Sequence, residues 1–156
     1  MPIIRGSLMK HAVASLAMLF AVALMAGCAT QEGPATTRPD ESLVNTYWKL
    51  TALDGESPDV VDGQREPHFV LHADPARVMG STGCNRMMGN YRLEASTLRF
   101  MALSSTRMAC PHGASIERRF LAALNATTAW RIEGERLWLL DAQHETLARF
   151  EAVHLQ

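Results

Sequence analysis

The chain has 156 residues and a formal net charge of −1, with 47% hydrophobic and 20% charged residues. A chain of this length holds one domain plus a targeting segment, and its ordinary composition excludes a largely disordered protein. The basic residues are spread along the sequence without forming a cluster. We therefore do not expect a protein that binds nucleic acid.

The N-terminal region begins with basic residues and continues into the uncharged run AVASLAMLFAVALMAG, residues 12–27. This run is shorter than the about 20 residues that a membrane-spanning helix needs, which disfavours the alternative of an anchor helix. A basic start, a short apolar stretch and then small residues are typical of a secretory signal peptide. We therefore interpret residues 1–27 as a lipoprotein signal peptide that starts at Met1 or Met9.

The sequence LMAGC, residues 24–28, resembles the lipobox of bacterial lipoproteins, in which the cysteine is lipidated and becomes the new N-terminus. By this resemblance Cys28 carries the lipid, palmitate included, and Ala29 favours the outer membrane. Several acyl chains hold a protein stably at a membrane. We therefore expect a lipid-anchored protein on the periplasmic face of the outer membrane. Removal of residues 1–27 leaves 13 basic and 16 acidic residues, which is a net charge of −3.

The lipidated N-terminus and the polar stretch after it, residues 28–44, contain Gly33, Pro34 and Pro39 and show no apolar periodicity. Such a composition predicts a flexible tether. A tether of this length reaches roughly 20–25 Å. We expect the folded domain to cover residues 45–154 and to lie close to the membrane.

Most of this domain alternates between apolar and polar residues, which predicts strands. The predicted strands cover residues 47–53, 68–73, 77–81, 89–94, 96–103, 128–133, 136–142 and 146–153. Residues 112–126 differ, because Ile116, Phe120 and Leu124 recur every four positions, which predicts an amphipathic helix. The sequence therefore predicts a mainly β (α+β) fold, with an antiparallel sheet curled into a small barrel-like domain with one helix.

Two cysteines, Cys84 and Cys110, remain once Cys28 is lipidated. An exported domain folds in an oxidising compartment, so we predict a disulfide between them. The closed loop spans 27 residues. By chain entropy such a bond stabilises the domain by about 3.5 kcal/mol.

Two other chemistries compete with the disulfide. A nucleophilic thiolate needs a nearby base, and although His112 follows Cys110 closely, no spacing arranges a catalytic triad. Thioethers and imidazoles, here Met87, Met88, Met108 and His112, suit copper(I) together with the thiols, although methionines more often fill a core. We therefore expect no enzyme, no metal and no cofactor, and we keep a metal-binding (copper) or thiol-redox envelope protein as the alternative.

Three stretches, GSTGCNRMMGNYRLE (80–94), LSSTRMACP (103–111) and FLAALNATTAWRIEGERLWLLDA (120–142), resemble the META domain of HslJ-like, heat-inducible bacterial lipoproteins. The opening NTYWKLTALDGE (45–56) fits the first strand of that family, so the resemblance covers essentially the whole mature domain. It implies a small, β-rich, barrel-like fold with a helix. It also implies a link to the envelope, to heat stress and to tolerance of certain antibiotics, and it supplies no catalytic residue.

The expected function is thus a non-catalytic, stress-associated binding or interaction module. Its expected contacts are the membrane, through the lipid on Cys28, and an unknown envelope protein or ligand, and we expect a monomer. The motif residues near the predicted disulfide are Asn85, Arg86, Gly89, Tyr91, Thr106 and Arg107. We interpret them first as structural, with a ligand surface as a hypothesis. We expect Arg107 to be partly buried against an acceptor.

Overall fold

The computed structural model describes residues 39–59, 63–109 and 113–154. Its elements, in chain order, are β1 (Tyr47–Leu53), β2 (His68–His72), β3 (Arg77–Ser81), β4 (Arg86–Glu94), β5 (Thr97–Ser105), α2 (Ala114–Ala126), β6 (Ala129–Glu133), β7 (Arg136–Leu140) and β8 (Thr146–Val153). Within these ranges, no helix has the length and apolar character needed to cross a membrane.

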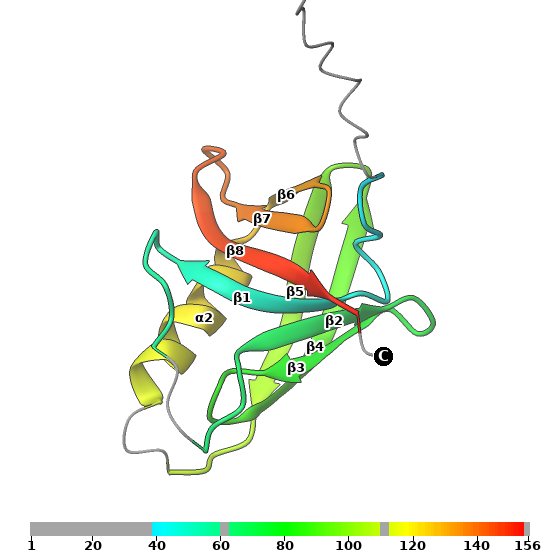
Figure 1. Cartoon of the computed structure of the whole chain (residues 1–156). Helices are drawn as coiled ribbons and strands as arrows, with labels where there is room; N and C mark the ends of the chain where they lie inside the picture. The colour runs from blue at the N-terminus through cyan, green and yellow to red at the C-terminus, as the bar shows by residue number, and fades with distance from the viewer. Residues whose placement is uncertain (1–38, 60–62, 110–112, 155–156) are drawn as a thin grey trace, which may run out of the picture. The chain divides into compact units, whose positions relative to one another are not determined.

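The eight strands form a closed barrel in which each strand pairs antiparallel with the next and β8 returns to pair with β1 (Figure 1). This arrangement confirms the predicted fold class. The pairing between β5 and β6 is shorter than that between the other neighbouring strands, with Thr97 opposite Ala129 as its single registered pair. Helix α2 connects these two strands along the chain.

The inward-facing side chains of the strands fill the barrel with apolar groups. Trp48, Phe69 and Phe150 are fully buried, and the rings of Phe69 and Phe150 meet edge to face with centroids 4.9 Å apart. Edge-to-face contact is a favoured geometry for aromatic rings. The barrel interior is therefore a packed hydrophobic core.

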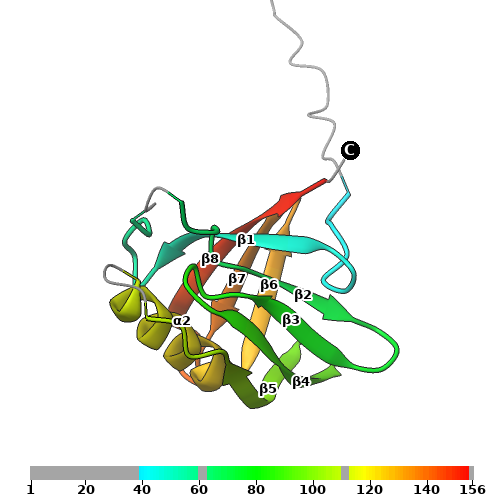
Figure 2. The same cartoon turned by 90° about the horizontal axis from the view of Figure 1, so that it is seen from below.

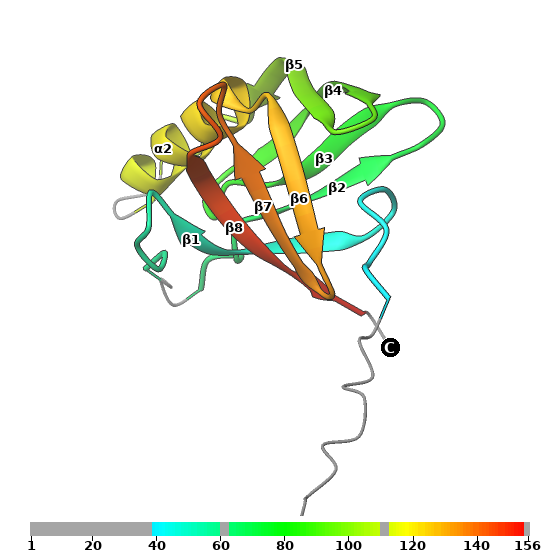
Figure 3. The same ribbon diagram turned by 90° about the horizontal axis from the view of Figure 1, so that it is seen from above.

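Helix α2 lies beside one end of the barrel (Figures 2 and 3). It packs against β5, β8, β1 and β7 and buries Phe120, Ala123 and Leu124. The four-residue period of the sequence therefore predicted the buried face of the helix correctly. The ring of Phe120 lies 6.0 Å from that of Phe150, so the helix extends the core of the barrel.

The segment before β1 packs against the barrel at residues that the sequence assigned to the flexible tether. Leu43 is buried in the core, and its carbonyl accepts a hydrogen bond from Trp48 Nε1 at 3.0 Å. The backbone N–H of Glu41 donates to the carbonyl of Gly134 at 2.9 Å. Residues 40–44, which the polar composition assigned to the tether, therefore belong to the folded domain.

Strand β4 begins at Arg86, three residues before the predicted start, and β5 ends at Ser105, two residues after the predicted end. The pairing shifts register between Met88 and Asn90, which marks a bulge. A bulge interrupts the two-residue alternation. The extra residue lies on β5, whose alternation breaks after Met101, whereas β4 alternates throughout; the bulge therefore accounts for the missed end of β5 and not for the missed start of β4.

Candidate functional site

The turn between β3 and β4 holds the first motif residues. Three hydrogen bonds join Thr82 and Asn85: Thr82 N–H donates to the Asn85 carbonyl at 2.8 Å, Thr82 Oγ1 donates to the same carbonyl at 3.3 Å, and Asn85 N–H donates to Thr82 Oγ1 at 3.0 Å. Between them Gly83 has a φ of 98°, a conformation that residues with a side chain rarely adopt. The turn therefore requires glycine at position 83, and hydrogen bonds between its own residues hold it closed.

The side chain of Asn85 connects this turn to β5 and to α2. Its Oδ1 accepts hydrogen bonds from Thr106 Oγ1 and from Met108 N–H, both at 2.8 Å. Its Nδ2 donates to Glu117 Oε2 at 2.7 Å, and the residue is only 4% exposed. Asn85 and Thr106 thus belong to one hydrogen-bond network, which is what the structural interpretation of these motif residues expects.

The predicted disulfide begins in the same turn. Cys84 Sγ lies 3.3 Å from Asn85 Nδ2 and 3.6 Å from the carbonyl oxygen of Met108. Cys110, two positions after Met108, lies outside the described residues, as do Cys28 and His112. The bond to Cys110 therefore stays a prediction, with Cys84 held beside the segment that leads to its partner.

Two further motif residues are packed into the sheet. A Cβ on Gly89 would lie 2.9 Å from both Leu103 Cδ2 and the carbonyl oxygen of Met101, so this position admits only glycine without displacement. Tyr91 is buried, and its hydroxyl donates to the His72 carbonyl at 3.1 Å. Burial raises the pKa of Tyr91 above its ordinary value.

The two motif arginines face solvent. The expectation that Arg107 is partly buried is wrong, because this residue is exposed. The reason is that the backbone N–H of Met108, and not the arginine side chain, supplies the donor that meets Asn85. Arg86 is also exposed and lines, with Arg65 and other residues, an open cleft of about 540 Å³ beside the turn.

The thioethers proposed as copper(I) ligands are not brought together. Met87 is 1% exposed and faces the core, whereas Met88 is 52% exposed on the opposite face of β4. Met108 lies elsewhere, beside Cys84. The structure therefore gives these three residues no common site.

An exposed surface that the sequence did not predict covers the outside of β3, β4 and β5. We call it the arginine–methionine face and define it as Arg77, Met79, Arg86, Met88, Asn90, Arg92, Arg99 and Met101. The pairing places Met79 directly opposite Met88, and Arg92 directly opposite Arg99. The arginines, which look scattered along the chain, are thus gathered by strand register.

The arginine–methionine face combines exposed apolar side chains with an excess of positive charge, since Glu94, which pairs with Arg92 at 4.0 Å, offsets only part of the charge of its arginines. Met79, Met88 and Met101 are 49%, 52% and 40% exposed. A hollow of about 470 Å³ lies over this face between Arg77, Asn90 and their neighbours on β5. Like charges directly opposite in a sheet are destabilising, and Glu94 contacts Arg92 of the Arg92–Arg99 pair on one side only, so a further anion would relieve the remaining repulsion.

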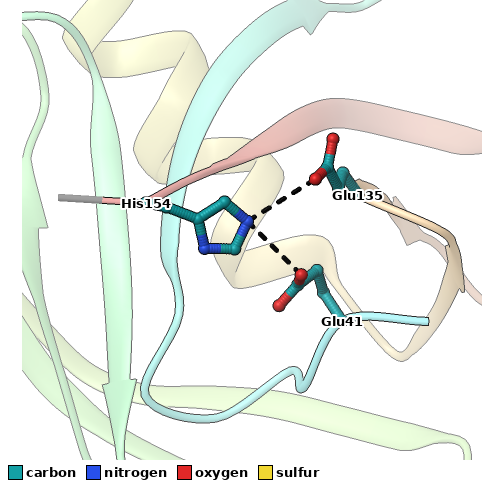
Figure 4. A group of neighbouring side chains, drawn as sticks. All are labelled: Glu41, Glu135 and His154. Atoms are coloured by element: carbon teal, nitrogen blue, oxygen red, sulfur yellow. Dashed lines mark ion pairs between the residues drawn. The ribbon is translucent and has the colours of Figure 1, made fainter. Parts of the chain in front are cut away.

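A second group joins the segment before β1, the β6–β7 turn and the end of β8. Glu41, Glu135 and His154 each offer a ligand atom, and the three atoms lie within 4.8 Å of one another. Figure 4 shows the carboxylates of both glutamates on the same side of the imidazole, close to its Nε2. Glu41 and His154 stand at opposite ends of the domain sequence and Glu135 lies in the β6–β7 turn, so no local motif could have indicated the group.

Comparison with known proteins agrees with the fold. A family model for the META domain matches residues 41–154. A protein from Burkholderia xenovorans, solved by NMR, is 30% identical, with 72% of this chain and 85% of that chain covered and a TM-score of 0.59. A second NMR structure is 20% identical, with 69% and 88% covered and a TM-score of 0.54.

A crystal structure of a DUF4847 family protein from Bacteroides vulgatus is 15% identical, with 73% of this chain and 96% of that chain covered and a TM-score of 0.53. At this identity the likeness concerns the fold alone. No curated protein matches the chain. The family match spans most of the sequence and the whole barrel, and on that ground the chain belongs to the META domain family.

Proposed function

We propose that this chain is a non-catalytic lipoprotein of the bacterial envelope, held by lipid on Cys28 at the periplasmic face of the outer membrane. Its META domain acts there as a stress-associated binding module. The arginine–methionine face is the surface that binds the partner. This face is the single observation that carries the proposal.

The structural use of the motif residues supports a binding module rather than an enzyme. The side-chain oxygen of Asn85 accepts hydrogen bonds from Thr106 and Met108, and its side-chain nitrogen donates one to Glu117. These bonds fix the turn against β5 and α2. Polar groups of a catalytic site face a substrate-sized cavity with reacting atoms in reach. Asn85 borders the cleft beside the turn, but its side chain is 4% exposed and its polar atoms are bonded to groups of the fold.

The chemistry of the arginine–methionine face indicates the class of partner. Methionine side chains adapt their shape to different apolar groups and are favoured on binding surfaces. Arginines that surround them select carboxylates or other anions. The chain after residue 27 has a net charge of −3, so a positive face on it is a local feature and not a property of the whole protein. We therefore propose that the partner is a segment of an envelope protein that carries both acidic and apolar side chains.

The anchoring part of the proposal is tested by mass spectrometry of the N-terminal peptide from purified envelopes. We expect Cys28 to be the first residue and to carry acyl chains. The Cys28→Ser variant should be released from the membrane fraction with its fold unchanged. Membrane association that persists in Cys28→Ser, with the signal segment still attached, would instead indicate an anchor helix.

The binding part is tested by cross-linking in living cells, with and without heat stress. Wild type and Arg149→Glu, an exposed charge reversal on β8, should give the same stoichiometric adduct. The double variant Arg92→Gln/Arg99→Gln and the variant Met88→Glu should lose it while staying folded, as circular dichroism checks. An adduct that all variants retain would show that the partner binds elsewhere. Binding of the Cys28→Ser protein to anionic phosphatidylglycerol vesicles through the same arginines would assign the face to the membrane instead.

A further inference from the structure

The group Glu41, Glu135 and His154 has a donor set that suits a specific metal. Imidazole nitrogen with two carboxylate oxygens is a set that Zn²⁺ accepts, in a tetrahedral site with a fourth position for water or another ligand. Calcium and magnesium prefer oxygen ligands throughout. The copper(I) ligands considered from the sequence are soft sulfur atoms, so this is a different site with different chemistry.

The distances in this group fit a metal better than a hydrogen bond. His154 Nε2 lies 3.3 Å from Glu41 Oε1 and 3.6 Å from Glu135 Oε1. Both exceed the usual N–H···O range of about 2.7–3.2 Å, and one N–H cannot point at two acceptors equally. Ligands bound at about 2.0–2.1 Å in a tetrahedron lie about 3.3–3.4 Å apart. The two distances to His154 Nε2 are therefore close to the spacing of ligand atoms around one zinc ion, and the two carboxylate oxygens, which lie within 4.8 Å of each other, need only a small approach to complete it.

The backbone holds the three segments in place before any ion binds. Glu41 N–H donates to the Gly134 carbonyl at 2.9 Å, and Gly134 N–H donates to Asp40 Oδ1 at 2.7 Å. Ala152 N–H donates to the Glu135 carbonyl at 2.8 Å, which fixes the end of β8 to the same turn. Preorganised ligands lose little conformational entropy when the metal enters.

The site is also partly shielded from solvent. The side chains of Glu41 and Glu135 are 24% and 34% exposed, and that of His154 is 59% exposed. Two carboxylates at this separation repel each other, and the repulsion is stronger where water is partly excluded. A divalent cation bound by both carboxylates would remove this repulsion.

We propose that Glu41, Glu135 and His154 bind one Zn²⁺ ion, which clips the segment before β1 to the β6–β7 turn and to the end of β8 (Figure 4). The clipped segment lies at the end of the predicted tether, residues 28–44. The bound ion therefore fixes the point at which the chain leaves the barrel. This proposal uses residues outside the arginine–methionine face, so the two proposals stand or fall separately.

The test is titration of the tag-free Cys28→Ser chain from residue 28 onward with Zn²⁺, followed by calorimetry and thermal melting. We expect one ion per chain and a rise in melting temperature, because a ligand that binds only the folded state stabilises it. Glu41→Gln, Glu135→Gln and His154→Gln should each weaken Zn²⁺ binding by at least about tenfold. Mg²⁺ and Ca²⁺ at the same concentration should not shift the melting temperature.

Two control variants keep the same residue types outside the group. Glu133→Gln removes a carboxylate that pairs with Arg131, and His144→Asn removes an exposed imidazole from the β7–β8 turn. Both should bind Zn²⁺ like the parent chain. Hydrogen exchange adds a second readout, since Zn²⁺ should slow exchange of the Glu41 amide in the parent and not in His154→Gln. Zn²⁺ binding that is absent at millimolar concentration, or that survives His154→Gln, overturns the proposal and leaves a simple ion-paired cluster.

Discussion

The side-chain amide of Asn85 donates a 2.7 Å hydrogen bond to the carboxylate of Glu117, and thereby ties the β3–β4 turn to helix α2. The other oxygen of Glu117 accepts a bond from Ser105 Oγ at 2.8 Å, so the end of β5 joins the same network. Three elements that are distant in sequence therefore meet at one buried amide. A network of this kind is valuable when every member is satisfied and costly when one is removed.

Replacement of Asn85 by alanine should strongly destabilise the domain. The change leaves the Met108 N–H without its acceptor and removes one of the two hydrogen bonds to the Glu117 carboxylate, and a polar group left unsatisfied inside the protein costs about 1–3 kcal/mol. We expect a loss of about 2–4 kcal/mol in the free energy of unfolding, measured by urea denaturation. The matched control Asn90→Ala, on the exposed face of β4, should change stability by less than about 0.5 kcal/mol. Equal effects in the two variants would contradict the structural role of Asn85.

Gly80→Ala should damage the barrel because β2 approaches Gly80 too closely for a side chain. A Cβ there would lie 2.1 Å from the carbonyl oxygen of His68 and 2.9 Å from Phe69 Cα, both backbone atoms. Relief requires β2 and β3 to move apart, so we expect a loss of about 3 kcal/mol or more, or failure to fold.

The control for this change is Gly134→Ala, where a Cβ meets no atom within 4 Å and only the φ of 61° opposes it. That conformation costs an alanine about 1–2 kcal/mol. Melting temperatures of the two variants, measured side by side, separate close packing from backbone strain. A Gly80→Ala protein as stable as Gly134→Ala would show that the strands tolerate a wider spacing.

The parts of the fold that follow from local pattern were predictable. Strand β1 and helix α2 were found because a two-residue or four-residue period places their apolar side chains on one face. Residues 40–44 were missed because a single buried apolar side chain, Leu43, shows no period. Local pattern therefore locates regular elements but not isolated anchors.

The surfaces proposed for binding depend on register and closure of the barrel, which sequence alone did not fix. Arg92 faces Arg99 because β4 and β5 pair with a particular offset, and a shift by one residue would turn these side chains inward. Glu41 meets His154 because both ends of the domain sequence reach the β6–β7 turn. The spacing of residues along the sequence does not predict contacts that form only when the barrel closes.

The predicted disulfide can be tested by counting reactive thiols and by measuring the free energy of unfolding. Without reductant, the folded chain from residue 28 with Cys28→Ser should have no reactive thiol, and reduction followed by unfolding should release two. The Cys84→Ser/Cys110→Ser variant should lose about 3.5 kcal/mol in the free energy of unfolding, since the unfolded chain regains the entropy of a 27-residue loop. Two thiols that react in the native protein without reductant would favour the thiol-redox alternative.

The two tyrosines of the chain, Tyr47 and Tyr91, should make stability fall in alkali. Burial first, and then the hydrogen bond from Tyr47 to Glu66 at 3.0 Å and the charge of that carboxylate, raise the pKa of Tyr47 far above 10. Burial also raises the pKa of Tyr91. The folded state thus favours the neutral phenols, so their contribution to stability is complete below pH of about 10 and is lost as the pH rises above it.

The measurement is tyrosinate absorbance at 295 nm against pH, with circular dichroism recorded on the same samples. In guanidinium both phenols should ionise near pH of about 10, whereas in the native chain ionisation should begin at higher pH. The single-tyrosine variants separate the two phenols. Tyr91→Phe keeps only Tyr47, and Tyr47→Phe keeps only Tyr91. We expect the phenol of Tyr47 to stay neutral to a higher pH than the phenol of Tyr91. If both phenols ionise at the unfolded value while the dichroism is still native, Tyr47 does not donate to Glu66 in solution and the packing around it is looser than described.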